Sequence, residues 1–143
     1  RRESAKILEV GSLFLFGLLS AYTWLAAPAW TVATVRLVVD AGLLAIVLVS
    51  LAIDQPFTLQ YARERVPEQF WALPVFLTTN RIITATWAAA FTVLVAADAA
   101  AEWLPAVPLW LDILASVAAF LTAVWFSNWY PAFVRRRALG GAR

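Results

Sequence analysis

The chain has 143 residues, of which 63% are hydrophobic and only 14% are charged, and its mean hydropathy is +0.78. Soluble domains carry about a quarter charged residues, so these values exclude an ordinary soluble domain, and with no cysteine they also exclude a disulfide scaffold. The formal net charge of +2 is too small for a basic nucleic-acid surface. Histidine is absent, which removes the commonest general base and haem ligand. The composition predicts an integral membrane protein.

Four apolar stretches are long enough to cross a membrane, since a helix needs about 20 residues to span about 30 Å of hydrocarbon. We expect these spans at residues 7–25, 30–53, 80–104 and 108–130. Tight turns at Pro28 and Pro105 separate the spans within each pair. The predicted fold class is therefore all-α: a polytopic membrane protein with four transmembrane helices in two hairpins. An amphipathic interfacial connector joins the hairpins, and residues 1–143 form a single transmembrane domain.

Basic residues mark one side of the predicted bundle. Ten of the eleven lysines and arginines lie near the termini or in the 54–81 connection, and neither short turn contains any. The positive-inside rule assigns this side to the cytoplasm, and tryptophans and tyrosines near both ends of the spans agree with it. We therefore expect both termini to be cytoplasmic. No signal-peptide cleavage site follows the first span, and because the chain begins with Arg1 and lacks methionine, we expect a segment before it.

The connector at residues 54–79 is the only predicted link that is longer than a turn. Prolines at positions 56, 67 and 74 divide it, which predicts one amphipathic piece near 57–66 and another that begins at Pro67. One interpretation is a segment in the cytoplasmic headgroup layer, with its arginines near anionic lipid. The other is a docking surface for a cytoplasmic partner. The candidate contact residues are Phe57, Arg63, Arg65, Phe70 and Trp71, and the N-cap of the third span is expected at Thr78, Thr79 or Asn80.

Short motifs in the connector and the third span resemble a known family. The connector contains Pro56-x-x-x-Gln60, and the third span contains Asn80-Arg81 followed by Trp87-Ala88-x-x-Phe91. Over roughly residues 55–131 this pattern resembles the bacterial intracellular septation protein A family. Those are small polytopic inner-membrane proteins, typically of five spans, linked to cell-envelope and division processes and without established catalytic activity. The resemblance implies a bacterial inner-membrane protein with an accessory role in the cell envelope.

Ionisable side chains at membrane depth are the candidate functional site. Each costs about 2.5–3.5 kcal/mol unless it is paired or hydrated. They are Arg36, Asp40, Asp98, Glu102 and Asp112. Arg36 and Asp40 are four residues apart and can pair within one helix, while Arg36 also matches the predicted depth of Asp98 and could pair across helices. One interpretation of Glu102 and Asp112 is that both are solvated near the span ends.

Three roles for these charges remain open. A buried ion pair would fix helix register, a proton- or ion-linked site would use Asp40 as its titrating group, and a third role is contact with a partner. One arginine facing up to four carboxylates leaves surplus acid.

Small residues recur at about four-residue spacing in the last two spans, which favours their close packing in lipid. The packing candidates are Ala85, Ala89, Ala96, Ala115 and Ala119. The first span is bulky on all sides, which suits a helix facing lipid or a partner. Phosphate-loop, metalloprotease and nucleophile-elbow motifs are all absent, so we expect no enzyme activity, no catalytic residue, no metal and no cofactor.

The leading hypothesis is a non-catalytic structural or accessory subunit of a larger membrane or cell-envelope assembly. Its partners would be the lipid bilayer and either other membrane subunits or copies of itself, and not nucleic acid. The alternative is a small homo-oligomeric proton- or ion-coupled transporter or channel that uses Arg36, Asp40 and Asp98.

Overall fold

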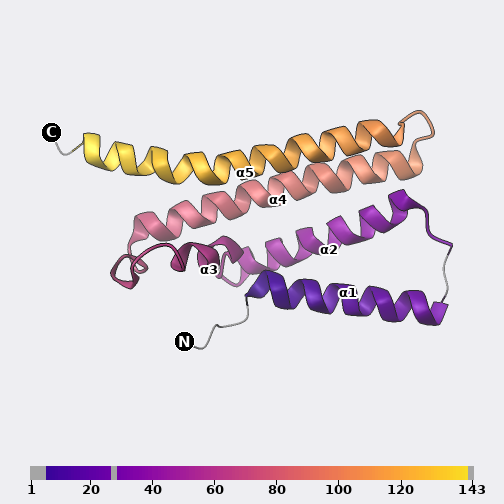
Figure 1. Ribbon diagram of the computed structural model, residues 1–143, viewed down its shortest axis with the longest axis horizontal. Coiled ribbons are helices and arrows are strands. Elements are labelled where there is room, and N and C mark those ends of the chain that lie inside the picture. Colours follow the sequence, from indigo (N-terminus) through magenta and orange to yellow (C-terminus); the bar gives the residue numbers. More distant parts are fainter. Residues whose placement is uncertain (1–5, 27–28, 142–143) are drawn as a thin grey trace.

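The computed structural model describes residues 6–26 and 29–141, and within these ranges it consists of helices and short connections without a strand (Figure 1). The helices are α1 (Ile7–Ala26), α2 (Val32–Ala52), α3 (Phe57–Arg63), α4 (Pro74–Trp103) and α5 (Leu109–Gly140), with a 3-10 turn at Glu68–Phe70. Four of them, α1, α2, α4 and α5, are long and apolar enough to cross a membrane. The predicted all-α class with four spans is confirmed. The predicted turn at Pro28 lies outside the described residues.

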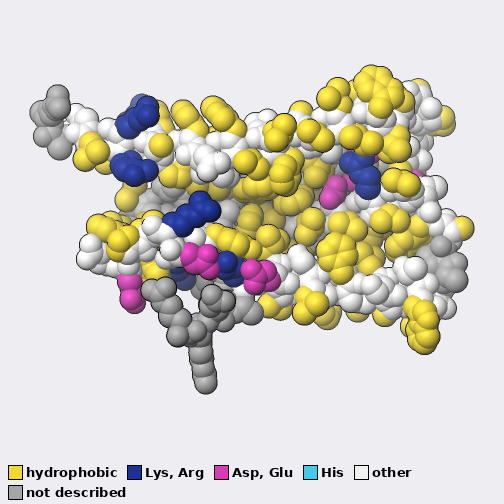
Figure 2. Space-filling model, in the orientation of Figure 1, with side chains coloured by type: hydrophobic (Ala, Val, Ile, Leu, Met, Phe, Trp, Pro, Cys, Tyr) yellow, Lys and Arg dark blue, Asp and Glu magenta, His cyan; other side chains and the backbone are white. Residues whose placement is uncertain are grey.

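The long helices lie side by side in the order α1, α2, α4, α5 (Figure 1). The α4–α5 hairpin and the α2–α4 pair make the most extensive contacts, and α1 packs along α2 at the edge of the bundle. α1 begins and α5 ends at the same end of the bundle, where α3 also lies (Figure 1). Figure 2 shows lysine and arginine side chains gathered at that end, beside a broad apolar band. The packing of the last two spans against each other agrees with the small-residue pattern.

α4 begins earlier than the sequence suggested. Its first residue is Pro74, and Leu73 precedes it without a side-chain capping bond. The expected caps at Thr78, Thr79 or Asn80 are therefore wrong, and all three lie inside the helix. Proline at the first helical position has a suitable φ and no N–H that needs a partner, so it starts a helix without a polar cap.

α5 continues past its expected end at residue 130 and reaches Gly140, with Pro131 inside it. Aromatic pairs four residues apart lie around the proline: Trp129 stacks on Phe133 across it, and Phe126 stacks on Tyr130 just before it, with ring centroids 5.0 Å apart in each pair. Such contacts stabilise the turn that the proline weakens. At 32 residues the helix is about 48 Å long, so it extends beyond a hydrocarbon core of about 30 Å.

The connector folds into the bundle instead of lying wholly on its surface. Asp54 follows α2 in the left-handed region (φ 58°), and the Gln55 N–H donates to the Ser50 carbonyl while the Asp54 N–H donates to that of Leu51. This pattern is a Schellman motif, which reverses the chain at a helix end. It brings Phe57 into a buried cluster with Val47 and Ala88.

Phe57 is only 7% exposed, so its expected role as an interfacial or partner contact is wrong. Its ring meets that of Trp87 edge to face at 6.4 Å, and its N–H donates to the Ser50 hydroxyl at 3.3 Å. Trp87 belongs to α4 and Ser50 to α2, so both partners lie outside the connector. The amphipathic pattern of the connector alone therefore did not reveal these contacts.

α3 also holds the start of α1. The Ile7 N–H donates to Gln60 Oε1 at 2.7 Å, which satisfies one of the free donors at that helix end. Lys6 Nζ lies 2.8 Å from Glu64 Oε1 and 4.1 Å from the ring centroid of Tyr61. The hydrogen bond from Lys6 to Glu64 raises the pKa of Lys6 above its ordinary value.

Glycines allow α1 and α2 to approach closely. A Cβ at Gly42 would lie 2.5 Å from the Leu15 side chain, and a Cβ at Gly11 would lie 2.9 Å from that of Ile46. Both distances are shorter than van der Waals contact, so only glycine fits without a shift of the facing side chain. The α1–α2 contact thus depends on these two positions, although α1 contains no buried residue.

Candidate functional site

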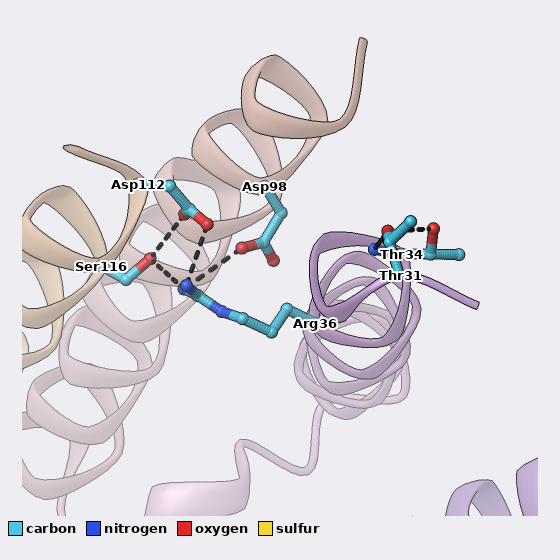
Figure 3. A network of polar contacts seen from close by, with 6 residues as sticks. All are labelled: Thr31, Thr34, Arg36, Asp98, Asp112 and Ser116. Carbon is cyan, nitrogen blue, oxygen red and sulfur yellow. Dashed lines mark hydrogen bonds and ion pairs between the residues drawn. The ribbon is translucent and has the colours of Figure 1, made fainter. Parts of the chain in front are cut away.

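Three helices bring the predicted intramembrane charges together at the end of the bundle opposite α3. α2 contributes Arg36 and Asp40, α4 contributes Asp98 near its C-terminus, and α5 contributes Asp112 in its first turn. Figure 2 shows a small charged group within the apolar surface near the α4–α5 turn, and Figure 3 shows its residues from close by.

The Arg36 guanidinium is the centre of this network (Figure 3). Its Nη2 lies 3.2 Å from Asp98 Oδ1, and its Nη1 lies 2.9 Å from Asp112 Oδ2. Nη2 also donates to Ser116 Oγ at 2.9 Å, and Ser116 Oγ donates to Asp112 Oδ1 at 3.4 Å. One side chain of α2 therefore binds α4 and α5 at the same time, through the planar fork of donors that only arginine offers.

The two carboxylates that hold Arg36 are fully removed from the surface: Asp98 is 0% and Asp112 1% exposed. The interpretation of Asp112 as a solvated residue near a span end is therefore wrong. Asp112 faces the α4 side of α5 because the short α4–α5 turn sets its first helical turn directly beside the last turns of α4. Breaking a buried pair of this kind is costly, since the remaining charge stays buried and unpaired.

Of the two pairings that the sequence allowed for Arg36, the one with Asp40 within α2 does not form, although both residues are described. Arg36 instead pairs across helices, as its predicted depth relative to Asp98 allowed. The reason is burial: the guanidinium extends toward the two carboxylates that have no access to solvent. Asp40 is half-buried and stands one helical turn after Arg36 on α2.

Glu102 belongs to a separate contact at the same end of the bundle. It accepts hydrogen bonds from the hydroxyls of Thr31 and Thr34, both at 2.8 Å. Thr31 is the N-cap of α2 and also accepts from the Thr34 N–H. Glu102 thus joins the start of α2 to the end of α4 and takes no part in the arginine network.

Sequence reasoning missed Ser116, Thr31 and Thr34. Ser116 stands four residues after Asp112, on the same face of a helix, and that spacing could have indicated it. Threonine at a helix start followed three residues later by a second polar residue is a common capping pattern, and it could have indicated Thr31.

The network contains more carboxyl groups than cations. Arg36 faces three carboxyl groups, those of Asp40, Asp98 and Asp112, so complete ionisation would leave two unbalanced negative charges. Apart from the ion-pair contacts, both carboxylate oxygens of Asp98 and Oδ2 of Asp112 have no hydrogen-bond partner among the described residues. Chemically, such a site can hold helices together and can take up a proton or a small cation. No group of three metal-ligating side chains suited to a metal ion occurs in the described part of the chain.

The predicted packing alanines only partly face a neighbouring helix. Ala89, Ala115 and Ala119 line an open apolar hollow of about 470 Å³ between α4 and α5, while Ala85 and Ala96 are exposed. The predicted packing role of Ala85 and Ala96 is therefore wrong, whereas Ala89 lies on the side of α4 that faces α5. The buried face of α4 is instead the one that carries Asn80, Thr84 and Asp98, because polar groups that need partners must face the bundle in lipid.

The remaining connector candidates divide into two sets. The Arg63 guanidinium lies over the Trp71 ring, 5.4 Å from its centroid, and Trp71 Nε1 donates to the Val66 carbonyl at 2.8 Å. Arg65 and Phe70 are exposed. The structure therefore brings Arg63 and Trp71 together and leaves the other two at the surface.

Comparisons with protein-family models, with curated proteins and with solved structures give no significant match for this chain. The fold and the site together define a class: a multi-pass α-helical membrane protein with a buried network in which one arginine faces a surplus of carboxyl groups.

Proposed function

We propose that this chain is a non-catalytic structural or accessory subunit of a larger assembly in a bacterial inner membrane, with both termini in the cytoplasm. The observation that carries the proposal is the Arg36 network, in which one guanidinium joins α2, α4 and α5 through two fully buried carboxylates. The costliest residues in the membrane are thereby used for architecture. A bundle held in this way offers a defined surface to its neighbours.

The residues that carry the resemblance to the septation protein A family support the same interpretation. Gln60 binds the start of α1, the Asn80 carbonyl accepts from the Thr58 hydroxyl at 3.0 Å, and Trp87 Nε1 donates to Ser127 Oγ at 2.9 Å. Each of these contacts joins two segments of the chain. A motif made of such residues serves the fold, which suits an accessory protein better than a catalyst.

α1 provides the surface for a partner. It has no buried residue, and large side chains such as Phe14 and Trp24 are 68% and 85% exposed. Lipid covers such a face in part, and a second membrane subunit or a second copy of the chain would cover it more specifically, since helices in lipid associate through packing.

The test is purification from membranes in a mild detergent, followed by size-exclusion chromatography and identification of subunits present in constant ratio. We expect a larger assembly that is lost when Phe14 and Leu18 on α1 are changed to alanine. The matched control is Leu121→Ala on α5, which removes a side chain that is 60% exposed and should leave the assembly intact. A protein that purifies alone as a monomer would contradict the proposal.

A second candidate function is favoured by the carboxylate oxygens that lack hydrogen-bond donors. A homo-oligomeric transporter could pass a proton or cation through the Asp40 and Asp98 carboxyl groups, because surplus negative charge in a poorly solvated site attracts both. Arg36 would then set the electrostatic potential of the path.

Asp40→Asn separates the two functions. Loss of proton- or ion-coupled flux in reconstituted vesicles, with the assembly intact, would contradict the accessory role. Unchanged flux together with loss of a co-purifying subunit would contradict the proposed transporter function. Glu68→Gln is the control, since it removes an exposed carboxylate from the 3-10 turn of the connector.

A further inference from the structure

A small polar hollow of about 160 Å³ lies at the end of the bundle that holds α3, remote from the Arg36 network. Asp54 and Gln55 line it from the turn after α2, Arg63 from the end of α3, and Leu77 and Arg81 from the first turns of α4. We call it the Arg63–Arg81 pocket. It has room for several water molecules, and hence for one phosphate group.

Local structure places each charge of the pocket. The Schellman motif at the end of α2 sets Asp54 in the left-handed conformation, and from there its carboxylate forms an ion pair with Arg81. Arg63 is held over the Trp71 ring, whose own N–H is bound to a backbone carbonyl. Both guanidinium groups are therefore positioned before any ligand arrives.

Arg63 retains donors that the protein does not use. Its Nε is buried and has no hydrogen-bond partner, and among the described residues Arg63 forms no ion pair. Arg81 has five N–H donors, and its ion pair with Asp54 uses only some of them. With two arginines and one aspartate, the lining carries a net charge of +1, which a monovalent anion would balance.

The surroundings indicate which anion. Apolar side chains are exposed along the start of α4, which carries part of the pocket lining: Leu77 of the lining is 38% exposed, and Val75 and Leu73, two and four residues before it, are 51% and 42% exposed. Arginine binds phosphate through two parallel hydrogen bonds, and basic pockets at a membrane edge attract anionic lipid headgroups. We propose that the Arg63–Arg81 pocket binds the phosphate of a phosphodiester supplied by an anionic phospholipid, whose acyl chains lie along the N-terminal turns of α4.

The test measures binding of phosphatidylglycerol to the purified, delipidated full chain in detergent by native mass spectrometry. Phosphatidylcholine, in which a cation offsets the phosphate, should bind more weakly. Arg63→Gln should weaken phosphatidylglycerol binding about tenfold, because it removes a charge-assisted hydrogen bond. The matched control is Arg65→Gln, which removes an exposed arginine two residues away and should leave binding unchanged.

Asp54→Asn should change the affinity for phosphatidylglycerol in the opposite direction from Arg63→Gln. It raises the lining charge from +1 to +2 and should tighten binding, while asparagine tolerates the left-handed conformation of Asp54. A merely misfolded variant would not bind more strongly, so this variant keeps the proposal testable if Arg63→Gln is unstable. Equal losses in the Arg63 and Arg65 variants would overturn the proposal, since binding would then follow overall charge.

The free headgroup glycerophosphoglycerol distinguishes a lipid from a soluble ligand. If it binds as tightly as the lipid, the pocket takes a soluble phosphodiester and the lipid assignment is overturned. If it binds only weakly, the acyl chains contribute as proposed.

Discussion

Replacing Arg36 by methionine removes the only cation from a network that contains two fully buried carboxylates. The guanidinium lies 3.2 Å from Asp98 and 2.9 Å from Asp112. At an effective dielectric constant of about 20, each contact contributes about 5 kcal/mol of Coulomb attraction before the cost of desolvation. Because Arg36→Met leaves both carboxylates buried without a cation, we expect a loss of about 3–5 kcal/mol in the free energy of unfolding.

The measurement is reversible unfolding in mixed detergent micelles at neutral pH, followed by tryptophan fluorescence. Arg65→Met is the control, and as an exposed substitution it should change the free energy of unfolding by no more than about 0.5 kcal/mol. The triple variant with Asp98→Asn and Asp112→Asn added to Arg36→Met should recover most of the loss, because no fully buried charge remains and Asp40 is only half-buried.

Asp98→Asn alone should cost less than Arg36→Met, since it removes one of the surplus negative charges and leaves Arg36 paired with Asp112. The reasoning is refuted if Arg36→Met costs less than about 1 kcal/mol, or if the triple variant is no more stable than Arg36→Met. Either result would mean that the bundle is held by apolar packing and that the network contributes little.

Three further predictions concern the rest of the fold. Gly42→Ala should cost about 1–3 kcal/mol of unfolding free energy through overpacking against α1, whereas Gly17→Ala, with no atom within 4 Å of the new Cβ, should be neutral or stabilising by up to about 1 kcal/mol; equal effects would contradict this packing. Trp87→Phe keeps an aromatic ring but loses the hydrogen bond to α5, so unfolding measurements should show a loss of about 1 kcal/mol. Glu64→Gln should lower the raised pKa of Lys6 toward its ordinary value of 10.5, as an NMR titration would show. The stabilisation from a raised lysine pKa is present below 10.5 and lost as the pH rises through the folded value, so the Tm difference between wild type and Glu64→Gln should narrow above pH 10.5, and a constant difference would argue against the contact.

The sequence by itself was sufficient to predict the membrane class and the four spans, because span length and hydropathy are local properties that determine whether a segment is stable in the bilayer. The short turn and the small residues of the last two spans also predicted that these two pack together. It also predicted which residues carry charge at membrane depth, since any ionisable side chain within an apolar span is conspicuous. The start of α4 at Pro74 was missed because hydropathy marks where a helix enters lipid and not where the helix begins.

Only the tertiary structure decided how the helices are rotated about their axes and which side chains meet. Arg36 had a partner one turn away in Asp40, yet it pairs with Asp98 and Asp112, because burial on three converging helices makes those carboxylates the ones that most need a cation. Phe57 has the pattern of an interfacial residue, yet the turn at Asp54 carries it into the core. These outcomes depend on contacts between residues tens of positions apart, and local patterns indicate only the depth of a residue in the membrane, as for Arg36 and Asp98, and not which side chains meet.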